Sequence, residues 1–296
     1  MGLPMGWGPP PTPVPVDPGP PVRAVRSGVE LYRWVAALGV IGQVLGLAIA
    51  LADPSVGRLA SLSSTGGISL SSTAPGFTGP ALLLLLGSGL IGFLAFILSI
   101  VAFVRWRSGV IELRRSAVPP GPFEAPRLTG AAAKAEGGYR RALWTMLIWL
   151  LTVIAGGVVI AVVLVSSLGL MTNSNGTAVA PTPSQVNHAV GSVVGYALAL
   201  GGILLVIELV LAYFVTESLE GFLETGPARP SPYDLGNVRG LVYLGMALGV
   251  ATLLNTWVLG AGAIAIAGPL LLFVACTRYL TAFDERLGGH VPTPYR

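Results

Sequence analysis

Glu208 is the residue best placed to do chemistry, because it is the one acid in a long apolar run from His188 to Val215. It lies nine residues before Glu217, so at helical rise it is about 12–14 Å below the charged end of that run. A carboxylate at such depth costs several kcal/mol unless it is paired or protonated. Two roles follow: a proton- or ion-coupling site, or a protonated acid hydrogen-bonded to a neighbouring helix.

Three glutamates at the end of the same run form a second polar feature. Glu217, Glu220 and Glu224 are spaced i, i+3 and i+7, which places them on one face of a helix. The nearest opposite charges are in segment 105–141: Arg114, Arg115, Arg140 and Arg141. Either the two sets form a layer of ion pairs, or both are solvated and exposed pairs contribute about 0–1 kcal/mol each.

Few residues in the sequence support metal binding, disulfide formation or catalysis. The single cysteine, Cys276, excludes an internal disulfide and a multi-cysteine metal site. The two histidines, His188 and His290, are too far apart in sequence to suggest paired ligation. The chain has no P-loop, nucleophile elbow, zincin motif or dinucleotide fingerprint. We therefore expect no cofactor, no metal and no catalytic activity.

The amino-acid composition indicates whether this chain folds in water or in a membrane. Of its 296 residues, 53% are apolar and only 10% are charged, whereas soluble domains have about 25% charged residues. So few charges could not cover a soluble globule of this length. The composition predicts an all-α integral membrane protein.

Long apolar runs predict the elements that position Glu208. A helix needs about 20 apolar residues to cross the hydrocarbon. Six spans are predicted, at about 34–52, 81–104, 142–170, 188–215, 238–256 and 259–280. They form a domain over 31–287, after a proline-rich tail (1–30) expected to be disordered and before a C-terminal tail (288–296).

Lys and Arg residues are distributed unevenly between the two sides of these spans. With six spans, 16 of the 17 lie on one side and Arg58 alone on the other. The positive-inside rule then places both termini in the cytoplasm of a cell-membrane protein. Anionic lipid headgroups account for the basic balance without nucleic acid. Asn175 begins a glycosylation sequon in a predicted outer loop, and its modification stays open.

The six spans pair into three similar in–out–in hairpins. Their entrances share Arg, Gly and aromatic residues, as in 26–34, 137–141 and 233–240, and recur at intervals of about 100 residues. Duplication and convergence under one membrane constraint both explain this. Small-residue pairs that favour close helix packing recur as well: Gly42 and Gly46, Gly191 and Gly195, Gly245 and Gly249.

A short run after the second span, Arg107-Ser108-Gly109, and the overall plan carry a resemblance to a known group. The chain resembles small polytopic prokaryotic membrane proteins of unknown function, particularly archaeal ones. The shared residues lie only at junctions between spans and loops. The resemblance implies no activity and no site residue.

Two functions remain. The first is a non-catalytic scaffold, accessory subunit or assembly factor, which would pack its glycine-bearing helices against itself or a partner in the bilayer. The second is a small transporter or channel with Glu208 in its path. An intramembrane enzyme would need a nucleophile or a metal set that the sequence does not display.

Overall fold

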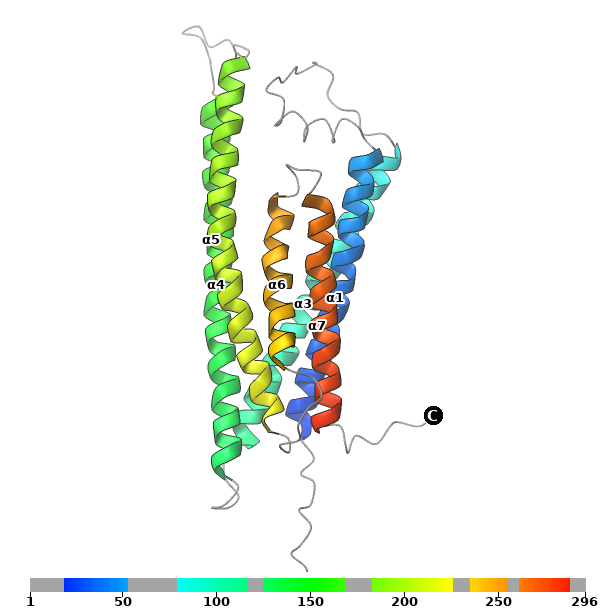
Figure 1. Cartoon of the computed structure of the whole chain (residues 1–296), viewed down its shortest axis with the longest axis vertical. Helices are drawn as coiled ribbons and strands as arrows, with labels where there is room; N and C mark the ends of the chain where they lie inside the picture. The colour runs from blue at the N-terminus through cyan, green and yellow to red at the C-terminus, as the bar shows by residue number, and fades with distance from the viewer. Residues whose placement is uncertain are drawn as a thin grey trace, which may run out of the picture.

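The protein is a bundle of long helices that run side by side (Figure 1). A computed structural model describes residues 19–52, 79–116, 125–168, 183–225, 235–254 and 261–287, which contain helices and no strand. The helices are α1 (Gly19–Ala52), α3 (Gly79–Ser116), α4 (Ala125–Leu168), α5 (Pro183–Leu223), α6 (Leu235–Leu254) and α7 (Ala261–Leu287). The predicted all-α class is confirmed. The C-terminal tail, most of the N-terminal tail and Asn175 lie outside the described residues.

Five of these helices can cross a membrane. α1, α3, α4, α5 and α7 each contain a stretch of 21 to 34 residues that is long and apolar enough. The prediction of a multi-pass membrane protein is therefore supported by length and composition. α6, with 20 residues, is not among the five.

The first helix begins earlier than the sequence suggested. α1 starts at Gly19, so residues 19–30, predicted to belong to the disordered tail, are helical, and that boundary was wrong. Pro20 and Pro21 occupy the first turn, where a missing N–H costs nothing. Val22 and Val25 then follow at helical spacing and are buried, so packing continues the helix beyond the predicted span.

The six helices form a closed ring of three hairpins. α1 packs on α3, α4 on α5, and α6 on α7. The second helix of each hairpin also packs on the first helix of the next hairpin: α3 on α4, α5 on α6, and α7 on α1. Of these three junctions between hairpins, the α3–α4 junction is the sparsest.

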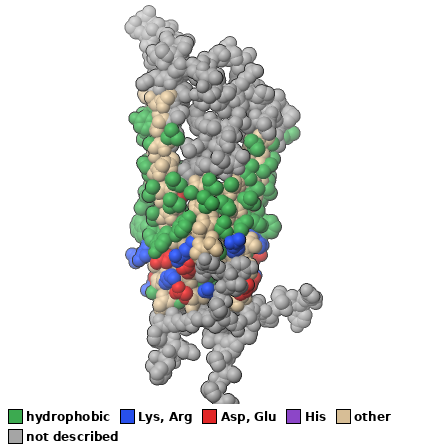
Figure 2. Space-filling view, viewed as in Figure 1, with side chains coloured by type: hydrophobic (Ala, Val, Ile, Leu, Met, Phe, Trp, Pro, Cys, Tyr) green, Lys and Arg blue, Asp and Glu red, His purple; other side chains and the backbone are tan. Residues whose placement is uncertain are grey.

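The buried core lies at the charged end of the ring. Figure 2 shows Lys, Arg, Asp and Glu side chains in a band near one end, with an apolar surface above it. The core beside this band includes Val25, Phe222, Tyr279 and Phe283. In the most apolar part of α4 no residue is buried, whereas in the most apolar part of α7 39% of the residues are buried. The buried core of the described helices thus lies mainly near the band, and large apolar side chains beyond it are exposed among the described residues.

Two glycines allow α4 and α5 to meet backbone to backbone. A Cβ at Gly138 would lie 2.6 Å from the Ser218 nitrogen, and one at Gly221 would lie 2.6 Å from the Ala135 nitrogen. No side chain fits at those distances, so glycine is required at both positions. Gly28 and Gly109 have equivalent roles between α1 and α3.

The small-residue pairs predicted from the sequence differ in how closely they pack on a neighbouring helix. Gly245 lies tightly against α7, where a Cβ would come within 2.9 Å of Leu272. Gly42 faces Ile91 loosely, at 3.9 Å. A Cβ at Gly46, Gly191 or Gly195 would have no described atom within 4 Å. Those three glycines therefore do not serve the packing of the described helices on one another.

Candidate functional site

Glu208 lies among three helices within the apolar region. It is on α5, and the Trp149 indole nitrogen on α4 donates a hydrogen bond of 3.1 Å to its Oε1. On the α6 side, a Cβ at Gly249 would lie 3.8 Å from Oε2. Gly249 therefore lies at ordinary contact distance from the carboxylate, and the indole supplies a donor from a neighbouring helix. This arrangement is compatible with either predicted role of Glu208.

The surroundings of Glu208 contain few other chemical groups. Among the described residues, no cluster of three His, Cys, Asp or Glu side chains could hold a metal ion. Cys276 is a buried free thiol on α7. Among the described residues, the site therefore consists of the Glu208 carboxylate and the Trp149 indole donor, with the Tyr32 phenol of α1 within electrostatic range of the carboxylate.

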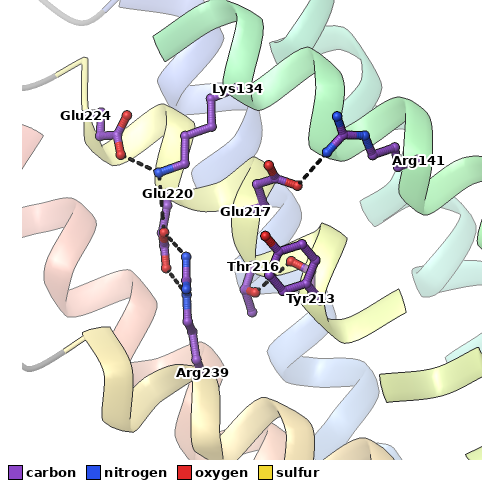
Figure 3. A network of polar contacts seen from close by, with 8 residues as sticks. All are labelled: Lys134, Arg141, Tyr213, Thr216, Glu217, Glu220, Glu224 and Arg239. Carbon is purple, nitrogen blue, oxygen red and sulfur yellow. Dashed lines mark hydrogen bonds and ion pairs between the residues drawn. The ribbon is translucent and has the colours of Figure 1, made fainter. Parts of the chain in front are cut away.

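Glu220 is the centre of the polar network at the charged end (Figure 3). Its carboxylate accepts two hydrogen bonds from the Arg239 guanidinium on α6. It also lies 3.5 Å from the Lys134 ammonium on α4. With its side chain only 10% exposed, Glu220 joins α4, α5 and α6 through ion pairs that are largely shielded from water.

The ion pairs of the other two glutamates of the acidic face are more exposed, because the Glu224 side chain is 47% exposed and Arg141, the partner of Glu217, is 59% exposed. Glu224 accepts a hydrogen bond from Lys134. Glu217 lies 3.5 Å from Arg141, whose guanidinium lies over the Phe214 ring, 5.7 Å from its centroid. A layer of ion pairs is therefore present at this end of the protein.

The partners in that layer differ in part from those the sequence suggested. Of the four predicted cations, Arg141 pairs with the acidic face, whereas Arg114 pairs with Glu136 at 2.8 Å. Lys134 and Arg239 were missed. Lys134 lies seven residues before Arg141, on the same helical face, and this spacing could have identified it. Nothing in the local sequence of Arg239 signals its partner, which comes from the preceding helix.

A buried serine adds a neutral connection between three helices. The Ser218 hydroxyl on α5 donates a 2.8 Å hydrogen bond to the Ala135 carbonyl on α4. It accepts one of 3.1 Å from the Trp106 indole on α3. The Trp106 ring also packs edge-on against Tyr139, with the centroids 4.8 Å apart. This cluster connects α3 to the α4–α5 hairpin near the charged end.

One ion pair lies at each junction between successive hairpins. The pairs are Arg114–Glu136 between α3 and α4, Glu220–Arg239 between α5 and α6, and Asp284–Arg26 between α7 and α1. The last has Arg26 Nε 2.7 Å from Asp284 Oδ1. An ion pair therefore connects the neighbouring helices at each of the three junctions.

Comparisons with known proteins add no homologue to this description. No family model, no curated protein and no solved structure matches the chain. The function must therefore be argued from the geometry.

Proposed function

We propose that the chain crosses the cell membrane six times as three in–out–in hairpins, with both termini in the cytoplasm. α6 packs on α5 and α7 within the ring. This position supports a sixth span with the same orientation as α1 and α4, the first helices of the other two hairpins. The band of charged side chains at one end of the molecule supports the orientation (Figure 2), because Lys and Arg favour the cytoplasmic side.

This topology predicts different compartments for residues 180 and 290. In a Cys276→Ser background, a membrane-impermeant maleimide should label the Ala180→Cys variant on intact cells. It should label the His290→Cys variant only after the membrane is opened, because the bilayer shields the cytoplasmic side. Labelling of both variants in intact cells, or of neither, would contradict the six-span arrangement.

We further propose that the protein is a non-catalytic scaffold or accessory subunit, which assembles with other membrane proteins or with itself. The supporting observation is the contrast between a packed charged end and the spans of α1, α3, α4 and α5, in whose most apolar parts at most 17% of the residues are buried. Helices in lipid associate through close packing and interhelical hydrogen bonds. Apolar faces that the described residues leave uncovered, together with Gly46, Gly191 and Gly195, suit contacts between molecules.

A transporter or channel with Glu208 in its path is the second candidate. The feature that favours it is a carboxylate deep in the apolar region, with an indole donor on one side and Gly249 at contact distance on the other. Intramembrane acids commonly mark ion and proton pathways.

The Glu208→Gln variant separates the two functions. For a scaffold, we expect no proton flux into proteoliposomes from either wild type or variant, and unchanged masses of cross-linked complexes in native membranes. The matched control is Glu224→Gln, which removes an acid at the charged end. A wild-type proton flux that is lost in Glu208→Gln and retained in Glu224→Gln would refute the scaffold and establish transport.

A further inference from the structure

Arg107 on α3 and Arg140 on α4 lie beside an aromatic contact at the α3–α4 junction. The contact is between Trp106 and Tyr139, whose ring centroids are 4.8 Å apart. Each arginine follows one of these rings by a single residue, which is about 1.5 Å of helical rise. Both arginines are exposed, and Arg107 is within electrostatic range of the Tyr139 phenol. The two cations therefore enter the junction at about the same level.

Neither arginine has an acidic partner among the described residues. The acids Glu136 and Glu217 pair with other arginines of α3 and α4. Two positive charges thus remain at one junction, and like charges repel each other. An anion between Arg107 and Arg140 would relieve this repulsion.

The Tyr139 hydroxyl is a further hydrogen-bond donor at this junction. It is buried, and no part of the chain that the structure describes supplies it with a hydrogen-bond partner. An unpaired buried polar group is costly, so an acceptor atom is favoured here. Phosphate oxygens accept charge-assisted hydrogen bonds from guanidinium groups and hydrogen bonds from hydroxyl groups.

The first two hairpins repeat each other and allow this junction to be compared with others. A Cβ at Gly28 would lie 3.0 Å from the Ala102 carbonyl oxygen, and one at Gly138 would lie 2.8 Å from that of Phe214. The two contacts are equivalent after shifts of 110 residues from α1 to α4 and 112 residues from α3 to α5. Each residue of the first hairpin therefore has a counterpart in the second.

The counterparts of the two arginines are not cations. Leu219 on α5 has the position of Arg107, and Glu30 on α1 has that of Arg140. Leu219 is 9% exposed and belongs to the core. Glu30 lies 3.8 Å from two arginines of its own helix. The α5–α6 and α7–α1 junctions thus have a buried leucine and a paired acid where the α3–α4 junction has two arginines.

The arginines also lie at the edge of the apolar surface. Arg107 follows the apolar run of α3 by three residues, and Arg140 precedes that of α4 by two. Figure 2 shows Lys and Arg side chains directly beside the apolar surface. Trp144, one turn from Arg140 towards the apolar region, is 57% exposed, and tryptophan is enriched where a membrane meets water. This is the level at which lipid headgroups lie.

We propose that Arg107 and Arg140, together with the Tyr139 hydroxyl, bind the phosphate of an anionic phospholipid such as phosphatidylglycerol. The inference rests on the proposed membrane topology, because that places the charged end at a bilayer surface. Basic sites between helices on the cytoplasmic side suit anionic headgroups. A zwitterionic lipid suits this site less, because its own cation already compensates the phosphate.

Lipid titration of the purified full chain in detergent tests this site. Native mass spectrometry gives the dissociation constant of the first bound phosphatidylglycerol, with phosphatidylcholine of the same acyl chains as the comparison. We expect the wild type to prefer phosphatidylglycerol. Each arginine near a membrane surface contributes about a factor of five, so Arg107→Gln/Arg140→Gln should bind phosphatidylglycerol about 30-fold more weakly. Tyr139→Phe, which keeps the ring contact, should weaken binding about two- to tenfold.

The matched control is Arg105→Gln/Arg278→Gln, which removes the same charge elsewhere. Arg105 lies on the α1 side of α3, since its Cβ is 3.4 Å from a Cβ at Gly28, and Arg278 is on α7. This control should change binding by less than about twofold, a small share of the effect of one arginine. Equal weakening by the two double variants would reduce the effect to general surface charge and overturn the proposal.

Other outcomes would overturn the site as well. Displacement of the lipid by an equal concentration of inorganic phosphate would indicate a site for free phosphate. Equal affinity for both lipids would refute the anionic preference, and unchanged binding in Tyr139→Phe would refute the part of the hydroxyl. The thermal melting of each variant verifies that it is folded, and the single variants Arg107→Gln and Arg140→Gln, each expected to bind about fivefold more weakly, repeat the test with a smaller change.

The topology can fail separately from the lipid site. Binding in detergent does not depend on which side of a membrane the charged end faces. Maleimide labelling that contradicts six spans, combined with a lost preference only in the Arg107 and Arg140 variants, would refute the topology and support the site. Labelling as expected, combined with equal affinity for both lipids, would refute the site alone.

Discussion

The Gly138→Ala variant is expected to lose about 1–3 kcal/mol of unfolding free energy, the usual cost of overpacking a close contact. The new methyl group would lie 2.6 Å from the Ser218 nitrogen and 2.9 Å from its Cα. Because these are backbone atoms, the collision is relieved only if α4 and α5 separate. The loss should appear as a lower melting temperature of the purified protein in detergent.

Gly137 is the matched control for this substitution. It precedes Gly138 in the same turn of α4, yet a Cβ there would have no described atom within 4 Å. Alanine is favoured over glycine inside a helix by about 1 kcal/mol, so Gly137→Ala should keep or raise the melting temperature. Equal melting of Gly138→Ala and wild type would show that α4 and α5 do not meet as described.

The Glu220→Ala variant should be the most damaging change in the ion-pair layer, with a loss of about 2–3 kcal/mol, somewhat below the cost of breaking a fully buried pair. Removing this carboxylate leaves Arg239 and Lys134 facing each other without the acid between them. The three helices that Glu220 joins should loosen together. Thermal unfolding in detergent measures the loss.

Glu224→Ala and a double-mutant cycle distinguish pairing from simple loss of charge. The Glu224 side chain is 47% exposed, so its removal should cost less than about 1 kcal/mol. Adding Arg239→Ala to Glu220→Ala should cost little more than Glu220→Ala alone, because the two side chains act as a pair. Strictly additive losses would mean that this pair contributes nothing of its own.

The sequence was sufficient to predict the acidic residues of the site but not most of the residues that they contact. The apolar run around Glu208 was sufficient to place one acid in the membrane region, and the spacing of Glu217, Glu220 and Glu224 was sufficient to define an acidic face. The choice of Trp149 and Arg239 as partners was not predictable, because each comes from another helix. Side-chain spacing along one helix carries no information about which helix lies opposite.

Glycine packing shows the same limit. The sequence drew attention to Gly191 and Gly195, which have no described neighbour within 4 Å, and not to Gly138 and Gly221, where two backbones touch. Small residues recur on every face of glycine-rich spans. Only the position of the adjacent helix decides which of them must remain glycine.

By itself the sequence determined that this chain is helical and belongs in a bilayer, since too few charges are present to cover a soluble surface and the apolar runs are long enough to cross hydrocarbon. The tertiary structure decided how the three hairpins meet: in a ring in which the second helix of each hairpin packs on the first helix of the next. Hydropathy is a property of each segment alone. The closeness of two helices depends on both surfaces at once, so it emerges only when the helices are placed side by side.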